Sequence, residues 1–219
     1  MFEKFEDAKG IIFDCDGCLL DSMGAWRSVE YKLIELTGRE WTEADMEEIR
    51  GGSMSHTAQV FHERYGVMES DQAVLDFVHE TMWDYYTAKA TLKPGVGEFV
   101  EHVHALGVPM AIVSSTAGKY LRAGLAHVGL LDELSAIVST QESGLSKQQP
   151  DIYLAALHAL GVEDPSEAWG FDDSIYAIRV MKRTGLSTVG TYDADDAGTF
   201  EVLSDTATLA VRSFEELLV

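Results

Sequence analysis

Two aspartates lie one residue apart directly after an apolar run near the start of the chain. The run is Gly10–Phe13, and Asp14 and Asp16 follow it. The run predicts a buried β-strand, and alternate side chains of a strand point to the same side, so the two carboxylates can face one point. Carboxylates that converge in this way favour a bound cation or a shared proton. Gly17 allows a sharp exit from the strand because it has no β-carbon, although a plain Asp-rich turn is the simpler interpretation.

A hydroxyl cluster follows a second apolar run. Ser114, Ser115 and Thr116 come directly after Met110–Val113. Hydroxyl and free N–H groups at the end of a strand suit phosphate oxygens. The same cluster is also typical of a helix cap, with Ser115 or Thr116 as the capping residue. The cluster therefore predicts either an anion site or a helix start.

Lys147 lies just before a predicted helix. Pro150 has the backbone torsion favoured in a first helical turn, and an apolar stripe continues from there until Gly161 ends it. A lysine at this place can direct a compact positive charge at an anion. A solvated surface lysine is the alternative interpretation.

Two adjacent acids follow another short apolar run. Asp172 and Asp173 come after Ala168–Phe171 and before Ser174. Adjacent side chains of a strand point in opposite directions, so we expect one carboxylate to bind a metal directly and the other to support it through water or a neighbouring group. The same three residues can also cap the helix that follows.

These four motifs together resemble those of the haloacid dehalogenase-like (HAD) superfamily, in particular its β-phosphoglucomutase-like and phosphoglycolate phosphatase-like members with a helical cap. The first family motif, Asp-x-Asp-Gly-x-Leu-x-Asp-Ser, is matched over residues 14–22. The second, an apolar strand that ends in Ser or Thr, is matched at Ser114, and the acidic motif is matched over residues 172–174. Gln148 replaces the first proline of the Lys-Pro-x-Pro-Asp pattern, and Ala177 replaces a glycine often found after the acidic motif.

The resemblance implies a phosphatase that hydrolyses a small phosphorylated metabolite, such as a phosphosugar or a phosphoglycolate-like compound. By this resemblance Asp14 attacks phosphorus and forms an aspartyl-phosphate. Asp16 protonates the leaving alkoxide and then activates water. Ser114 and Lys147 hold the phosphoryl oxygens, and Ser115 is a further candidate for substrate binding.

The resemblance also implies a magnesium ion. Its predicted ligands are Asp14, the backbone carbonyl of Asp16 and Asp173, with help from Asp172. Magnesium prefers hard oxygen ligands of this kind.

Two alternative functions remain open. A phosphosugar mutase of the β-phosphoglucomutase type resembles this chain in all four motifs, but the histidine and arginine of those mutases correspond to Trp26 and Met54 here, which favours hydrolysis. A non-catalytic binding protein of the same fold is the second alternative. Asp16 argues against the dehalogenases of the superfamily, and a phosphonate-cleaving relative would need a cap lysine where none occurs between Lys32 and Lys89.

From Pro94 onward apolar runs alternate with amphipathic helical patterns, which predicts an α/β fold. We expect a Rossmann-like parallel sheet with helices on both faces. The expected strands after Gly10–Phe13 cover residues 110–113, 136–138, 168–171, 188–190 and 208–211. Ligands of such sheets bind at the carboxyl ends of the strands, where these motifs lie.

Between the first two motifs the pattern is all-helical. It predicts an inserted α-helical cap domain over residues 23–91, within a core domain formed by residues 1–22 and 92–219. A cap can select the substrate. Its candidate residues, near the hinge or a Gly-rich turn, are Trp26, Arg27, Arg50, Ser53 and His56.

The composition is strongly acidic. The chain of 219 residues has 16 Lys and Arg against 37 Asp and Glu, a formal net charge of −21. Such a surface repels nucleic acid and anionic lipid, so a phosphate site needs local positive charge. No apolar stretch is long enough to span a membrane, and we expect a cytoplasmic protein that is a monomer or a weak homo-oligomer. Cys15 and Cys18 have Cys-x-x-Cys spacing but no further zinc ligands at recognisable spacing, which disfavours a zinc or redox motif.

Overall fold

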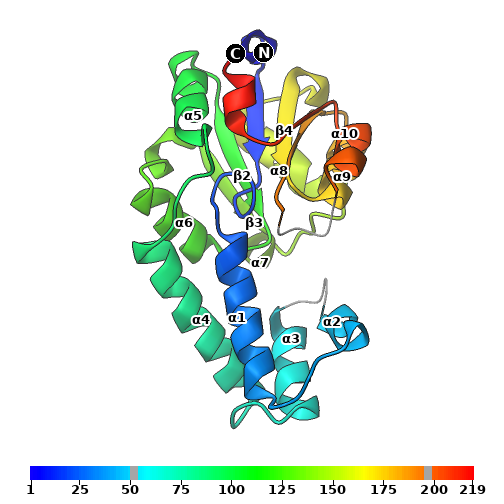
Figure 1. Cartoon of the computed structure of the whole chain (residues 1–219). Coiled ribbons are helices and arrows are strands. Elements are labelled where there is room, and N and C mark those ends of the chain that lie inside the picture. The colour runs from blue at the N-terminus through cyan, green and yellow to red at the C-terminus, as the bar shows by residue number, and fades with distance from the viewer. Residues whose placement is uncertain (50–53, 195–198) are drawn as a thin grey trace. The chain divides into compact units, whose positions relative to one another are not determined.

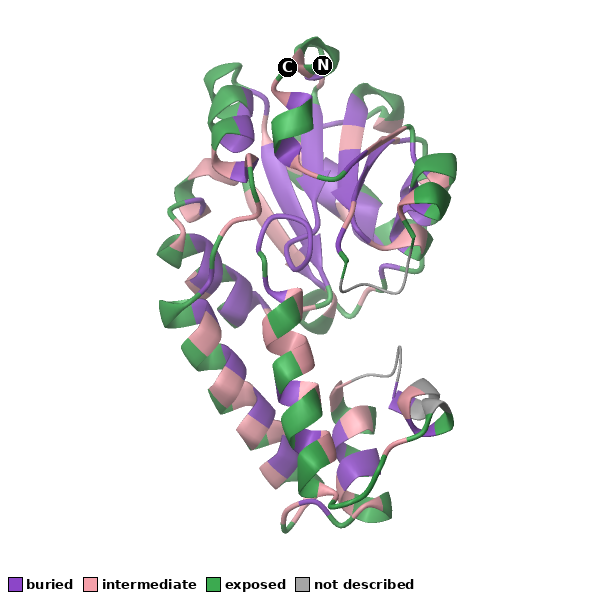
Figure 2. Cartoon of the chain, viewed as in Figure 1, coloured by how far each residue is buried: buried purple, intermediate pink, exposed green. Residues whose placement is uncertain are grey.

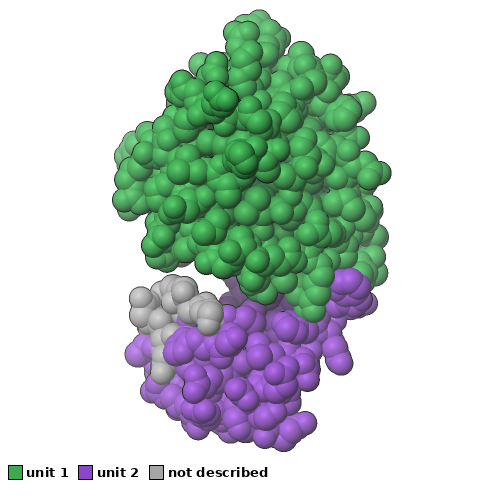
Figure 3. All heavy atoms as spheres, turned by 180° about the vertical axis from the view of Figure 1, so that it is seen from behind, with its two compact units in different colours: residues 1–23, 86–219 green, residues 24–85 purple. Residues whose placement is uncertain are grey.

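The computed structural model describes residues 1–49, 54–194 and 199–219. Contacts between residues divide the chain into two compact units, coloured separately in Figure 3. The first, here called the core unit, contains Met1–Met23 and Tyr86–Val219. The second, here called the helical unit, contains Gly24–Tyr85.

A six-stranded parallel sheet forms the centre of the core unit (Figure 1). Its strand order is β3-β2-β1-β4-β5-β6. The strands are β1 Gly10–Phe13, β2 Met110–Ser114, β3 Ala136–Ser139, β4 Ala168–Asp172, β5 Ser187–Thr191 and β6 Leu209–Val211. The predicted fold class is confirmed. The last strand begins one residue later than expected, at Leu209.

Helices cover both faces of this sheet. The α-helices that follow β1 in the core unit are α5 Val96–Ala105, α6 Gly118–His127, α7 Thr140–Ser143, α8 Pro150–Leu160, α9 Ile175–Thr184 and α10 Phe200–Thr206. Short 3-10 segments cover Phe2–Phe5, Leu131–Glu133, Pro165–Glu167 and Phe214–Leu217. Pro150 starts α8 and Gly161 ends it in the left-handed conformation, as predicted.

The alternation of side chains along β1 produces two different cores. Ile12 packs with residues of α8, α9 and α10 in a mainly aliphatic cluster. Phe13, on the opposite face, packs against Phe99 of α5, with ring centroids 6.3 Å apart, and against Phe171 at 4.8 Å. All four residues of β1 are buried, and the central strands are coloured as buried in Figure 2. A strand buried on both faces holds the residue that follows it in a defined position.

The described residues of the helical unit form helices and loops without strands, as expected. It contains most of α1 Met23–Leu36, α2 Glu43–Ile49, α3 Met54–Gln59, a π-helical segment Val60–Arg64 and most of α4 Asp71–Ala88. Ser70 caps α4, since its Oγ accepts the backbone N–H of Ala73 at 3.0 Å. In the described ranges no helix combines the length and the apolar character that a bilayer span requires.

Candidate active site

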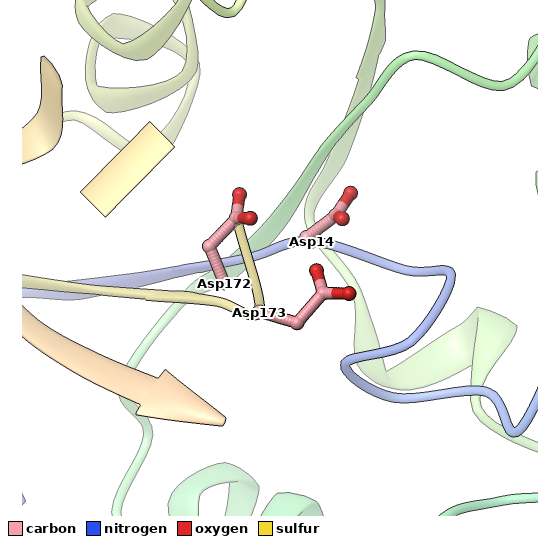
Figure 4. A group of neighbouring side chains, drawn as sticks. All are labelled: Asp14, Asp172 and Asp173. Atoms are coloured by element: carbon pink, nitrogen blue, oxygen red, sulfur yellow. The ribbon is translucent and has the colours of Figure 1, made fainter. Parts of the chain in front are cut away.

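Three buried aspartates meet at the carboxyl ends of β1 and β4. Phe13 of β1 pairs with Phe171 of β4 in parallel register, so Asp14 and Asp172 follow side by side. One carboxylate oxygen from each of Asp14, Asp172 and Asp173 lies within 4.8 Å of the others. Figure 4 shows the three side chains gathered around one space. The register of the sheet thus brings together acids that are far apart in the sequence.

Lys147 completes this cluster. Its Nζ lies 3.0 Å from Oδ1 of Asp14 and 2.7 Å from Oδ2 of Asp172, and its side chain is only 4% exposed. Burial by itself would lower the pKa of Lys147, but Asp14 and Asp172 outweigh burial and hold that pKa well above its ordinary value. The surface-lysine interpretation is therefore wrong, and Lys147 is a charged ammonium next to Asp14.

The carboxyl group of Asp14 is destabilised in its ionised form. Burial raises the pKa of Asp14 to about 7, Lys147 opposes this effect, and Asp172 and Asp16 add to it. A carboxylate in this environment gains from any additional positive charge placed beside it.

The cluster fits a divalent cation. Three carboxylates face a single ammonium group, so the buried site carries excess negative charge. Asp14 Oδ1 and Asp172 Oδ2 are buried, and no group among the described residues donates a well-oriented hydrogen bond to them. The Nζ of Lys147 lies close to both oxygens. The donor set consists of hard oxygens, which suits magnesium, and Asp16 contributes no side-chain oxygen to it.

Gly17 leaves room for one of the acids. It adopts a left-handed φ of +77°, and a β-carbon built at this position would collide with Oδ2 of Asp173. The first motif therefore requires glycine here for two reasons, namely its backbone conformation and the close approach of the Asp173 carboxylate.

The carboxylate of Asp16 is held by three hydroxyl groups. Oδ1 accepts hydrogen bonds from Ser22 Oγ at 2.6 Å and from Tyr86 OH at 2.5 Å. Oδ2 accepts one from Thr116 Oγ1 at 2.7 Å. The interpretation of Thr116 as a helix cap is wrong, because α6 begins at Gly118, and its N-cap residue, Ala117, has no side-chain cap.

Tyr86 was not predicted as a site residue. It is separated from Asp16 by 70 positions, and nothing in the local pattern of α4 distinguishes it from other helical aromatic residues. Only the tertiary structure shows that it is fully buried and in contact with Asp16.

Ser114 ends β2 as predicted and is 2% exposed. Its Oγ accepts the backbone N–H of Thr116 at 3.1 Å. Ser115 is exposed, and its carbonyl accepts hydrogen bonds from Thr140 and Gln141. The hydroxyl of Ser114 therefore lies at the carboxyl edge of the sheet, where it also orders the following turn.

Lys93 is a second, partly buried cation that sequence reasoning missed. Its Nζ donates to the carbonyl of Gly17 at 2.7 Å and to the carbonyl of Tyr192 at 3.0 Å, and it lies 2.8 Å from Oδ2 of Asp193. These contacts connect the loop after β1 with the loop after β5. The charged end of Lys93 thus supports the turn that carries Asp16.

The remaining candidates from the sequence lie elsewhere or are not described. Trp26 and Arg27 lie on α1 and His56 lies on α3, all in the helical unit. Arg50 and Ser53 fall outside the described residues. Cys15 and Cys18 are buried free thiols, and burial raises the pKa of both well above the ordinary value, which keeps them protonated near neutral pH.

Comparisons with known proteins identify the family of the chain. The model of the haloacid dehalogenase-like hydrolase family matches residues 8–185. The phosphorylated carbohydrates phosphatase of Thermotoga maritima is 24% identical over 181 residues, which cover 83% of each protein. The fructose-1-phosphate phosphatase YqaB of Escherichia coli is 25% identical over 194 residues, covering 86% of this chain and 97% of that protein. Some curated relatives are longer, and this chain spans 47% and 62% of the length of two of them.

A solved structure shares the fold. The β-phosphoglucomutase of Clostridium difficile superposes with a TM-score of 0.73 at 22% identity, covering 96% of this chain and 93% of that one. The match of the family model covers all four motifs, from Asp14 to Ser174. The chain therefore belongs to the haloacid dehalogenase-like hydrolase family, and its named relatives place it among the phosphoric monoester hydrolases of that family.

Proposed function

We propose that this protein is a magnesium-dependent phosphatase that hydrolyses a small phosphorylated metabolite through an aspartyl-phosphate on Asp14. The observation that carries the proposal is the cluster of Asp14, Asp172 and Asp173 around Lys147 at the carboxyl ends of β1 and β4. A buried carboxylate beside an ammonium group is suited to attack an anionic phosphoryl group, because the lysine reduces the repulsion between them.

Asp14, Asp172, Asp173 and the backbone carbonyl of Asp16 would hold the metal. A bound magnesium ion supplies positive charge that keeps Asp14 ionised and neutralises the phosphoryl oxygens. Lys147 contributes a fixed positive charge beside Asp14, and Ser114 offers a hydroxyl at the end of β2. These groups bind and orient the phosphoryl group before the attack.

Asp16 provides the proton transfers. In the first half-reaction the carboxyl group of Asp16 protonates the alkoxide oxygen as its bond to phosphorus breaks. In the second half-reaction the resulting carboxylate accepts a proton from the water that attacks the phosphorylated Asp14. The products are the free alcohol and inorganic phosphate, and both aspartates return to their starting forms.

A phosphorylated sugar is the substrate class that the relatives favour. The Thermotoga maritima and Escherichia coli relatives are named for phosphorylated carbohydrates and fructose 1-phosphate. We propose that the insertion predicted over residues 23–91 acts as a cap that selects the substrate, with Trp26, Arg27 and His56 as candidate contacts. Arg50 and Ser53 remain sequence-based candidates, as do a cytoplasmic location and a monomeric or weakly associated state.

One substitution tests the nucleophile. Asp14→Asn should abolish release of phosphate from p-nitrophenyl phosphate, while its circular dichroism spectrum remains that of the unmodified protein. Removal of metal with EDTA should likewise stop turnover, and added Mg²⁺ should restore it. Unchanged turnover by the Asn variant would mean that another group attacks phosphorus.

The mutase remains the alternative, since the neighbour from Clostridium difficile that shares the fold is named a β-phosphoglucomutase. Incubation with the two anomers of glucose 1-phosphate separates the two activities. Release of free phosphate supports hydrolysis, whereas formation of glucose 6-phosphate would support the mutase. A panel of phosphorylated sugars, phosphoglycolate and nucleotides, assayed for phosphate release, then identifies the substrate class.

A further inference from the structure

We propose that Tyr86 is a positioning residue for proton transfer, because it fixes Asp16 in the orientation from which only Oδ2 can exchange a proton with the substrate. This inference rests on the proposed phosphatase activity. It assigns a role to a residue outside the four sequence motifs.

The two carboxylate oxygens of Asp16 accept different numbers of hydrogen bonds. A carboxylate oxygen has two lone-pair sites. Ser22 and Tyr86 donate to both sites of Oδ1, whereas Thr116 donates to Oδ2 and leaves its second site available. Among the described residues these are the hydrogen-bond partners of the Asp16 side chain. Oδ1 is therefore saturated, and Oδ2 is the oxygen that can carry the exchanged proton.

The two donors to Oδ1 belong to different parts of the chain. Ser22 belongs to the same loop as Asp16 and is six positions away, so its hydroxyl moves with that loop. Tyr86 comes from α4, 70 positions away, and it anchors the carboxylate to a separate element. An anchor of this kind restricts rotation of the Asp16 side chain, which positions the reacting group more precisely.

Close packing fixes the ring of Tyr86. Tyr86 is fully buried. A β-carbon on Gly124 of α6 would lie only 2.8 Å from Cδ1 of Tyr86, so the ring rests directly against the backbone of that helix. The ring of Tyr120 lies 5.6 Å away, centroid to centroid. Because the ring cannot shift toward α6, its hydroxyl is held at one place beside Asp16.

The test uses the dependence of the reaction on the leaving group. A p-nitrophenolate leaves without a proton, whereas the alkoxide of a sugar phosphate needs one. In Tyr86→Phe we expect kcat/KM for the best sugar phosphate of the panel above to fall by on the order of 10- to 100-fold. The kcat/KM for p-nitrophenyl phosphate should change by less than about threefold. This ratio reports the step that forms the phosphoenzyme, and in that step the nitrophenolate leaves without a proton from Asp16.

A second readout examines the hydrolysis of the phosphoenzyme. With p-nitrophenyl phosphate, Tyr86→Phe should release a rapid burst of about one nitrophenolate per enzyme followed by slower turnover, because Asp16 also acts as the base for water. The matched control is Tyr120→Phe, which removes a hydroxyl from the neighbouring tyrosine, a residue that is not a hydrogen-bond partner of Asp16. It should retain the kcat/KM ratio between the two substrates.

Gly124→Ala provides an independent variant, since it keeps the tyrosine but displaces its ring. It should show the same selective loss on the sugar phosphate. Equal losses on both substrates in Tyr86→Phe, or no loss on either, would overturn the positioning role. Absence of phosphatase activity in the unmodified protein would instead reject the proposed function, so the two failures are distinguishable.

Discussion

The Nζ atom of Lys147 lies 3.0 Å from Oδ1 of Asp14, and neither side chain is more than 9% exposed. A buried ion pair of this kind is costly to form and strongly destabilising to break, because the remaining charge keeps no counterpart. Under the proposed function Asp14 is the nucleophile, and this ion pair would then serve catalysis. The surrounding acids make it the positive centre of an otherwise negative site.

Replacement of this lysine should therefore lower the rate of the chemical step. We expect Lys147→Met to lower kcat on p-nitrophenyl phosphate by on the order of 10²- to 10³-fold, the usual effect of removing a charge that stabilises the transition state. Steady-state kinetics measures this effect. The control is Lys4→Met, which removes an exposed lysine and should leave kcat unchanged. Full activity in the Lys147 variant would show that this cation does not contact the reacting phosphoryl group.

Gly17→Ala should weaken metal binding. The new β-carbon would occupy the space of Asp173 Oδ2, so the carboxylate must move away from Asp14. Isothermal titration with Mg²⁺ measures the loss, and we expect an affinity at least about tenfold lower. The matched control is Gly107→Ala, which has a similar left-handed φ of +73° but no neighbour within 4 Å. Equal Mg²⁺ affinities of the two variants would contradict the close packing inferred at Gly17.

Lys93→Met should destabilise the core unit. The substitution removes the donor to the carbonyls of Gly17 and Tyr192 and the counterion of Asp193. We expect the free energy of unfolding to fall by about 1–2 kcal/mol, because two carbonyls and a carboxylate lose a charged donor in a partly buried place. Urea denaturation measures this change. The double variant Lys93→Met with Asp193→Asn should recover part of the loss, and a double variant less stable than the single one would argue against the pairing.

Asp45 should make the helical unit sensitive to acid. Hydrogen bonds from Thr42, first through its side chain and then through its backbone, followed by one from Tyr65, hold the pKa of Asp45 well below its ordinary value. A carboxyl group whose pKa is lower in the folded state than in the unfolded state stabilises the folded state. This stabilisation is fully present above the pKa of the unfolded state, about 3.9, and is lost as the pH falls below it toward the pKa of the folded state.

The measurement for this prediction is thermal unfolding as a function of pH. Asp45→Asn should lower the melting temperature by several degrees at pH 7, because it loses the charge that accepts these hydrogen bonds. The difference from the unmodified protein should shrink as the pH falls below 4, since the native carboxylate is then progressively protonated. A difference that stays constant down to the lowest pH would reject the assigned role.

Much of the candidate site could be predicted from local sequence. Apolar runs followed by Asp14, Ser114 and Asp172 identify buried strands with polar ends, because burial on both faces requires a continuous apolar run. Parallel strands place those ends at one edge, so their proximity follows from the fold class alone. The glycine of the first motif likewise follows from its backbone conformation.

The contacts of Tyr86 and Lys93 could not be predicted in this way. Their side chains reach Asp16 and Gly17 across 70 and 76 positions, and such contacts depend on how helices and loops pack in three dimensions. Local periodicity contains no information about them. The interpretation of Thr116 as a helix cap was wrong for the same reason, since the acceptor that its hydroxyl finds is 100 positions away.

The sequence by itself therefore determined the class of fold, the identity of the acids and the lysine, and the edge of the sheet where they gather, because these depend on hydrophobic periodicity and strand direction. Only the tertiary structure decided the ionisation of Asp14 and the orientation of Asp16. Both depend on burial and on the distances to groups from distant segments. Electrostatic and hydrogen-bond energies change steeply with these distances, and no local pattern of the sequence encodes them.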